Sequence, residues 1–374
     1  MDYTAKLQAL LDAAERDIYL TDGIYEISNT LIIHSNTRIR LSDNAVIRLA
    51  DGAGCTMLKN DMCEKDGYNY NITIEGGIWD GNNESQPKRG KRGDKTPYFI
   101  GHIMIMDGVE NLKIRDVTYK NPSCYAMQLI NIDRFTVENI TFDYNFRNVN
   151  MDGVHIQGPA KNGYIKNIKG ATNDDLVALN CNDCYKTWEK EDVTSGDIEN
   201  IVIEGLFADN GYTGVRLLSC GNKLRNISIK NIFGTYRFHG ISFTHHNIIP
   251  GAPVWIDNVD ISGVYCSKPP QTEPFDIRPV QSVDGEWGEG VHADGIENCA
   301  VILFAKGVKC GNISISHLHR TESAITKAPT IEIEEDATID NLCLFDISQN
   351  FENASGRELI VNNGTVNFLH KNIL

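Results

Sequence analysis

Apolar and polar residues alternate along most of this chain, in short runs that recur. The pattern apolar, any, apolar, any, small or polar, apolar begins at Ile72, Leu112, Phe135, Gly163, Ile201, Ile227, Val259, Ile313 and Leu342. Such alternation is typical of strands with one buried face, and the shortest spacing, about 23 residues, is typical of solenoid repeats. The sequence therefore predicts strands of three to five residues stacked in coils, each pairing in parallel with its equivalent in the next coil.

The beginning of the chain differs from the repeats. Residues 3–15 have an amphipathic helical pattern, and a helix there would cover the apolar end of the first coils. No Pro-, Gly- or Ser-rich linker interrupts the chain. We therefore expect one all-β domain over residues 1–374, with an N-terminal cap at 1–20, coils at 21–350 and a C-terminal cap at 351–374.

Asparagines and insertions also recur along the repeats. Asn139, Asn167 and Asn231 recur with the pattern and are expected to form an inward ladder that satisfies backbone groups at the turns. Insertions lengthen the repeat at 81–100, 183–197 and 267–300. Loops on one side of a solenoid tend to wall its binding face, and the first insertion holds the basic cluster between Lys88 and Lys95.

Charge and cysteine content narrow the class of partner. The formal net charge of −15 argues against nucleic acid or an anionic membrane as partner. The first residues are amphipathic and acidic and show no signal peptide or membrane span, which predicts a cytoplasmic protein whose ten cysteines are reduced. Cys181 and Cys184 form the one Cys-x-x-Cys motif, without a second pair at zinc spacing, so neither a metal nor another cofactor is expected.

Three carboxylates stand out between residues 148 and 184. Asp152 precedes one apolar run, and Asp174 and Asp175 precede the next, about 22 residues later. If the strands stack, the carboxylates stack as well. Carboxylates held at fixed separation can hydrolyse a glycosidic bond, because one protonates the leaving oxygen and another activates water. Crowding of the carboxylates raises the pKa of one of them, so that it can act as the general acid. The structural alternative is that the aspartates only stabilise turns.

The sequence resembles glycoside hydrolase family 28, the polygalacturonases and rhamnogalacturonases. The resemblance is carried by the segment TDGIYEISNTLIIHSNTRIRLSDNAVI, by Gly76–Asn82, and most specifically by N-x-D-G at Asn150–Gly153 followed by N-D-D at Asn173–Asp175. It implies a right-handed parallel β-helix. It also implies that Asp174 is the general acid and that Asp152 and Asp175 hold the attacking water of an inverting reaction.

Two further family motifs are replaced in this chain. Where the family has Gly-His-Gly, the sequence has Tyr212 and Thr213 between glycines, and where the family has Arg-Ile-Lys it has Ser242-Phe243-Thr244. Arg216 stands on the earlier coil in the register of the family's arginine, and His239, His245 and His246 follow on the neighbouring coil. The candidate substrate-binding residues are therefore Asn150, Asn173, Arg216, His239, Thr213, Tyr212, His245 and His155.

The leading interpretation is a cytoplasmic, inverting and exo-acting glycoside hydrolase for pectin-derived or related oligosaccharides, uronates among them. Its expected partner is an oligosaccharide or polysaccharide substrate, with no nucleic acid and no membrane. One alternative is a polysaccharide lyase or sugar epimerase on the same fold. Another is a non-catalytic carbohydrate-binding β-helix, in which the aspartates only cap turns. The two aspartate motifs at one-coil spacing favour the hydrolase, because turn chemistry alone does not require both.

Overall fold

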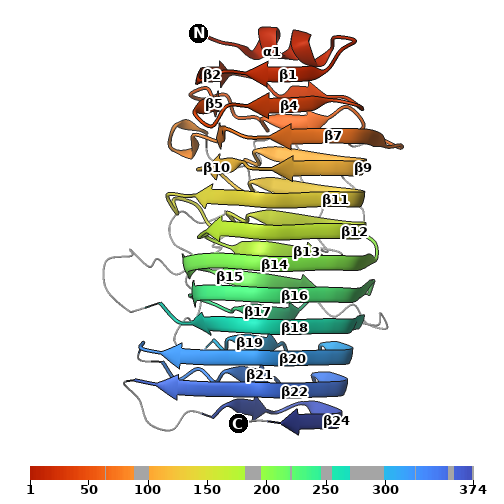
Figure 1. Ribbon diagram of the computed structural model, residues 1–374, viewed down its shortest axis with the longest axis vertical. Helices are drawn as coiled ribbons and strands as arrows, with labels where there is room; N and C mark the ends of the chain where they lie inside the picture. Colours follow the sequence, from red (N-terminus) through yellow and green to blue (C-terminus); the bar gives the residue numbers. More distant parts are fainter. Residues whose placement is uncertain are drawn as a thin grey trace.

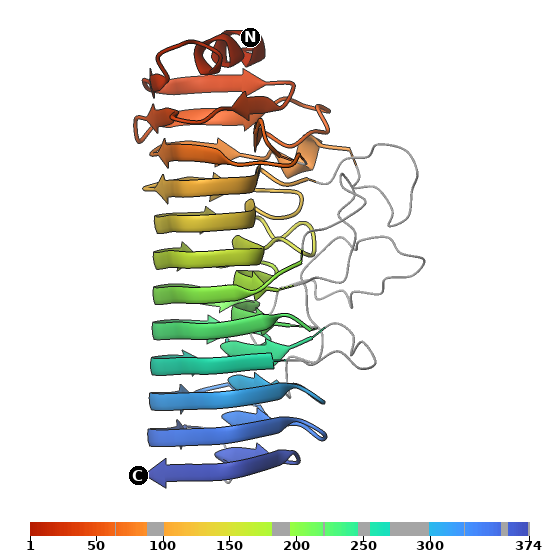
Figure 2. The same cartoon turned by 90° about the vertical axis from the view of Figure 1, so that its right-hand side faces the viewer.

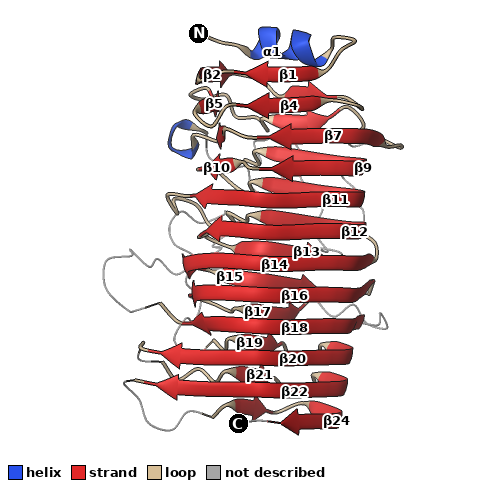
Figure 3. Ribbon diagram, in the orientation of Figure 1, coloured by secondary structure: helices blue, strands red, loops and turns tan. Residues whose placement is uncertain are grey.

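Parallel pairing between successive repeats winds the chain into a right-handed β-helix, capped by a helix at its N-terminal end (Figures 1 and 3). The computed structural model describes residues 1–63, 65–87, 101–181, 195–219, 221–245, 255–269, 299–324, 326–352 and 358–372. The two termini lie at opposite ends of the stack (Figure 2). No helix among the described residues is long and apolar enough to cross a membrane.

The elements have the following bounds. The first half contains α1 (Thr4–Leu11), β1 (Asp17–Leu20), β2 (Gly23–Ile27), β3 (Leu31–Ile33), β4 (Arg38–Leu41), β5 (Ala45–Leu49), β6 (Leu58–Asn60), β7 (Asn69–Glu75), β8 (Ile78–Asp80), η1 (Asn83–Ser85), β9 (Met104–Arg115), β10 (Thr118–Lys120), β11 (Met127–Asp143) and β12 (Val154–Gly170). The second half contains β13 (Asp175–Asn180), β14 (Ile198–Gly211), β15 (Thr213–Leu218), β16 (Lys223–Tyr236), β17 (Ile241–Thr244), β18 (Trp255–Ser267), β19 (Ile302–Phe304), β20 (Lys309–Glu322), β21 (Ile331–Ile333), β22 (Thr338–Phe351), β23 (Ile360–Asn362) and β24 (Thr365–Asn372).

Two faces of the helix matter for function. The broad face is the series β1, β4, β7, β9, β11, β12, β14, β16, β18, β20, β22 and β24, each paired with the next. The narrow face is the series β3, β6, the first parts of β9, β11 and β12, and then β13, β15, β17, β19, β21 and β23. Strands β9, β11 and β12 therefore run around a corner and belong to both faces.

The corners are made by residues in the left-handed region. On β12 the chain bends at Asn162 (φ 58°) and again at Asn167 (φ 52°), a conformation that Asn, Asp and Gly adopt more readily than other residues. The bends interrupt no strand, so β11 and β12 each reach 17 residues and are longer than predicted. The expected Asn ladder is confirmed for one pair, with Asn167 donating to Asn139 at 2.6 Å, whereas Gly205 stands between Asn167 and Asn231 in the same column. Its predicted inward position is wrong, because Asn139 lies at a corner, where its side chain is exposed.

The core is a set of aliphatic columns inside the coils. Val154, Val177, Val215 and Ile241 are in register on four successive coils, and none is exposed. Full burial of one such side chain stabilises the fold by about 1.5–3 kcal/mol, so the columns fix which residues face outward.

The N-terminal helix is shorter than the predicted residues 3–15. Helix α1 ends at Leu11, where Arg16 donates to the Leu11 carbonyl at 2.9 Å and so occupies the helix terminus. Its Leu7 and Leu11 are buried against the first coils. At the other end of the molecule β24 pairs with β22, so coil strands continue beyond residue 350 to Asn372.

Candidate active site

Three aspartates meet at the start of two neighbouring strands of the narrow face. The register of Val154 with Val177 places Asp152 and Asp175 at equivalent positions, and Gly153 donates its backbone N–H to the Asp175 carbonyl at 2.9 Å. Neighbouring strands lie about 4.8 Å apart. Asp152, Asp174 and Asp175 are exposed by only 3%, 6% and 2%. Electrostatic repulsion from Asp174 raises the pKa of both other carboxyls, so the three charges act on one another.

Gly153 shows why the first motif ends in glycine. A Cβ at this position would lie 2.4 Å from the ring of Phe142 and 2.6 Å from the Leu176 carbonyl oxygen. Any side chain would therefore push apart the two coils that carry the aspartates. Asn150, three residues earlier, bends the chain in the left-handed region (φ 55°).

Asn173 connects two segments of the site. Its Nδ2 donates to the Asn148 carbonyl at 2.6 Å, and its Oδ1 accepts from Arg237 Nη2 at 3.1 Å. The side chain is fully buried. These contacts support a role in holding the turn that presents Asp174 and Asp175.

His155 is positioned to hold Asp152. Its Nδ1 lies 2.8 Å from Asp152 Oδ2, and its ring stacks on Tyr125 with centroids 4.3 Å apart. Nε2 lies 3.4 Å from Nδ2 of Asn180, which is a donor. With Nε2 as the acceptor of this contact, the proton of a neutral His155 lies on Nδ1, which donates a hydrogen bond to the Asp152 carboxylate.

Burial dominates the protonation of the carboxylates. It raises the pKa of Asp152 well above the usual range, the charge of Asp174 raises it further, and the hydrogen bond from His155 opposes both. Burial also raises the pKa of Asp175 to about 6, against the opposing charge of Arg216. Because the carboxyls act on one another, the protons bound near neutral pH belong to the cluster and not to one residue.

Arg216 and Thr213 both contact Asp175. Arg216 Nη1 lies 3.3 Å from Asp175 Oδ2, and its Nε lies 3.3 Å from Thr244 Oγ1. Thr213 is in register with Asp175 on the next coil, and its hydrogen bond lowers the carboxyl pKa. The structure thus brings together Arg216 and a catalytic candidate 41 residues away in the sequence.

Arg237 was missed by the sequence analysis. It is 3% exposed, and its Nη2 donates to the Thr172 carbonyl at 3.2 Å and to Asn173 Oδ1. The guanidinium lies over the ring of Phe146 at 5.3 Å and over that of Tyr212 at 5.8 Å. Burial lowers its pKa to about 10, with Tyr212 and then Asp174 opposing, so it remains cationic.

Two of the Arg237 donors make no hydrogen bond to the part of the chain that the structure describes. Arg237 Nε and Nη1 are buried and have no hydrogen-bond acceptor among the described residues. The sequence signal for this residue is its place two positions before His239, but only the coil register shows that it lies beside Asn173.

The remaining candidates lie farther from the carboxylates. His239 follows Thr213 in the column that begins with Asp175, two coils away, and its Nδ1 donates to the Ala300 carbonyl at 2.7 Å. Burial and then Lys268 lower its pKa to about 3, so it is neutral. His245 follows the other end of β17 and contacts the Lys306 carbonyl at 2.7 Å.

Tyr212 lines the Arg237 side of the site. It is 4% exposed, and its ring stacks on Phe238 with centroids 4.8 Å apart. The basic cluster between Lys88 and Lys95, Cys184 and both loop tryptophans, Trp188 and Trp287, lie outside the described residues. In the described ranges no group of three or more His, Cys, Asp and Glu side chains is arranged to hold a metal ion.

Comparison with known proteins finds a matching family model, a distant relative and solved structures of similar fold. The family model described as glycosyl hydrolases family 28 matches residues 66–197. An exopolygalacturonase of Arabidopsis thaliana is 24% identical over 240 residues, 57% of this chain and 48% of that protein, so the chain spans about half of the relative's length.

Solved structures share the β-helix at low identity. The endo-xylogalacturonan hydrolase of Aspergillus tubingensis has a TM-score of 0.65 at 12% identity, covering 100% of this chain and 95% of that one. The tailspike protein of E. coli bacteriophage HK620 has a TM-score of 0.63 at 12% identity, covering 98% of this chain and 63% of that one. A hydrolase and a tailspike share the fold, so fold alone does not assign the chemistry.

Proposed function

We propose that this chain, a divergent member of glycosyl hydrolase family 28, hydrolyses glycosidic bonds of pectic oligosaccharides with inversion at the anomeric carbon. The observation that carries the proposal is the placement of Asp152 and Asp175 in register on adjacent coils, with Asp174 close enough to raise the pKa of both. A role in turns would not require three buried carboxyls that repel one another.

The hydrogen-bond partners divide the roles. Asp152 accepts a hydrogen bond from His155, and Asp175 accepts hydrogen bonds from Arg216 and Thr213, so each has a contact that stabilises its anion. These two carboxylates orient a water molecule and accept its proton as the water oxygen bonds to the anomeric carbon. Asp174 gives its proton to the glycosidic oxygen as the bond from that oxygen to the anomeric carbon breaks.

Arg237 supports a preference for uronates. Two of its buried donors have no acceptor among the described residues, and a planar guanidinium pairs well with a carboxylate. It lies near enough to Asp174 to be affected by that charge, so a sugar carboxylate bound there would sit beside the proposed acid. Exo action remains a prediction from the sequence.

The test is release of reducing ends from polygalacturonate, rhamnogalacturonan and neutral pectic oligosaccharides. Asp174→Asn is compared with wild type and with Asp116→Asn, a control at an exposed corner. Loss of a general acid should reduce the rate about 100-fold or more, whereas the control should keep it. Unchanged cleavage by Asp174→Asn refutes the role of Asp174. An ultraviolet-absorbing unsaturated product would establish a lyase instead.

A further inference from the structure

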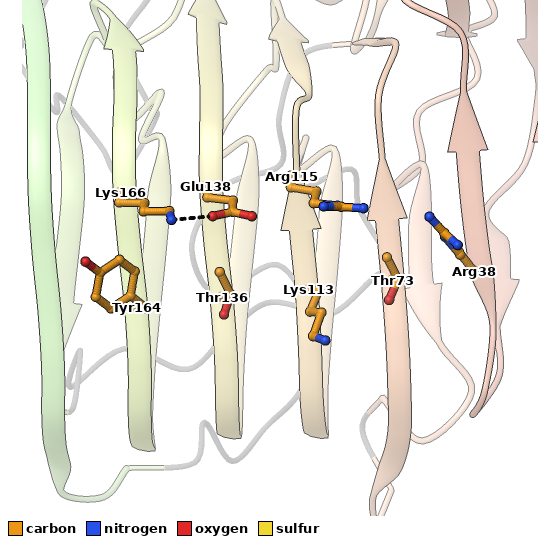
Figure 4. A pocket seen from close by; sticks show the side chains of 8 residues that line it. All are labelled: Arg38, Thr73, Lys113, Arg115, Thr136, Glu138, Tyr164 and Lys166. Atoms are coloured by element: carbon orange, nitrogen blue, oxygen red, sulfur yellow. Dashed lines mark ion pairs between the residues drawn. The ribbon is translucent and has the colours of Figure 1, made fainter.

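A groove of about 570 Å³ lies on the broad face, away from the three aspartates. Its lining residues come from β4, β7, β9, β11 and β12 (Figure 4), namely Arg38, Thr73, Lys113, Arg115, Thr136, Glu138, Tyr164 and Lys166. On β12 the bend at Asn162 separates these residues from His155 and the catalytic candidates. The groove therefore belongs to a different face from the proposed active site.

The groove is locally cationic in an acidic protein. Four cations line it, against Glu138 in the lining and Glu75 and Glu204 beside it, while the whole chain has a formal charge of −15. The carboxylates pair with cations at the sides: Glu75 Oε2 lies 2.8 Å from Arg38 and 3.1 Å from Arg115. These ion pairs hold the arginine side chains in place before any ligand arrives.

The other end of the groove is held in the same way. Lys166 Nζ lies 2.8 Å from Glu138 Oε2 and 5.4 Å from the centre of the Tyr164 ring. The Tyr164 hydroxyl in turn donates to Glu204 at 2.7 Å. Both ends of the groove are therefore built from side chains with fixed partners, which lowers the entropy cost of binding.

Lys113 lies between these two ends and differs from the other cations. Its in-register neighbours are Thr73 on one coil and Thr136 on the next, so no carboxylate stands directly beside it. Within the described part of the chain it makes no ion pair, and its side chain is exposed. An ammonium group between two hydroxyls is a site for one carboxylate with hydrogen-bonding groups on either side.

The dimensions favour an extended ligand. Five strands at about 4.8 Å spacing give a length of about 19 Å, and the groove volume is within the range of ligand sites, about 300–1,000 Å³. A single inorganic anion would occupy only the position at Lys113. We propose that the groove is a second, non-catalytic binding site for an acidic oligosaccharide, which places one sugar carboxylate on Lys113.

The anionic character of the ligand follows from the groove itself, and the choice of a sugar acid rests on the proposed function. The test titrates short oligogalacturonates into Asp174→Asn protein, which would not consume them, and into the same protein carrying Lys113→Met. Lys230→Met is the matched control, since Lys230 is exposed on the same broad face, beyond the groove. Unchanged melting temperatures of the exposed lysine variants would confirm folding.

We expect the titration to show two binding events. Lys113→Met should lower the affinity of one of them about tenfold or more, and Lys230→Met should lower the affinity of neither. Added salt should weaken the Lys113-dependent event, because the cation is exposed. If only one binding event is observed and Lys113→Met does not change its affinity, the proposed second site is wrong. Equally tight Lys113-dependent binding of inorganic phosphate or of poly-glutamate overturns the sugar assignment.

The two proposals can fail separately. If wild-type protein cleaves no sugar but Lys113-dependent binding persists, the hydrolase is wrong and the groove stands. If cleavage depends on Asp174 and binding is indifferent to Lys113, the groove is wrong and the hydrolase stands.

Discussion

Replacing Arg216 by glutamine should move the acidic limb of the pH–activity profile upward. Arg216 is the cation beside Asp175, whose pKa burial raises to about 6 even with that cation in place. Activity requires Asp175 as an anion, so the titration of Asp175 should contribute a rise of activity with pH through this value. Without the Arg216 charge, which lowers the pKa of Asp175, the effect of burial would raise this pKa further, and the rise of activity should occur at higher pH.

The size of the shift follows from the geometry. Unit charges at the observed 3.3 Å interact by about 5 kcal/mol at an effective dielectric constant of about 20. This is an upper bound, because Arg216 is 22% exposed and solvent screens the pair. An opposite charge at such distances commonly shifts a carboxyl pKa by about 1–3 units. The acidic limb should therefore move from about 6 to between about 7 and 9.

The assay is kcat/KM against pH for wild type, Arg216→Gln and Arg216→Lys. Arg216→Lys should shift the acidic limb by less than Arg216→Gln does, because lysine keeps the positive charge but lacks the planar guanidinium. Arg225→Gln is the control, since Arg225 pairs with Glu199 on the broad face. If Arg216→Gln lowers kcat/KM equally at every pH, Arg216 binds substrate and does not set the charge of Asp175.

Three other substitutions test the site. His155→Phe should keep the stacking on Tyr125 but remove the hydrogen-bond donor to Asp152, so kcat should fall about tenfold or more while KM changes little. A change confined to KM in initial-rate kinetics would mean that His155 binds substrate. The pKa of Asp175 is about 6 in the folded protein against 3.8 in the unfolded chain, so its ionisation lowers the free energy of unfolding by about 3 kcal/mol above pH 6 and by nothing below pH 3.8. Asp175→Asn should therefore raise the melting temperature at pH 7, and an unchanged melting temperature would contradict this cost of burial. Gly153→Ala should cost about 1–3 kcal/mol in urea denaturation, and a neutral result would show that the two coils can separate freely.

Much of the fold could be predicted from the sequence because the repeat is local. Alternation over a few residues specifies a strand, and a spacing near 23 residues specifies the coil. Strand length was harder to predict, because residues such as Asn162 bend the backbone without ending its pairing. The direction of the Asn139 side chain depends on the same bends.

The candidate site was predictable where its residues lie next to a recognisable motif. Asp152, Asp174 and Asp175 are in motifs one coil apart, and the structure places them together. Arg237 could not be predicted, because its position beside Asn173, 64 residues away, is set by which coils stack. The separation of His245 from His239 likewise depends on where β17 begins and ends. The expected cytoplasmic location remains a prediction.

The most direct test of the proposed chemistry is proton NMR of the first product formed by wild-type protein from the oligosaccharide it cleaves. The new reducing end should appear with the anomeric configuration opposite to that of the bond broken, and Asp174→Asn should form it at about one hundredth of the rate or less. A product that retains the configuration would mean that one of the three aspartates attacks the sugar directly, and the assigned roles would be wrong.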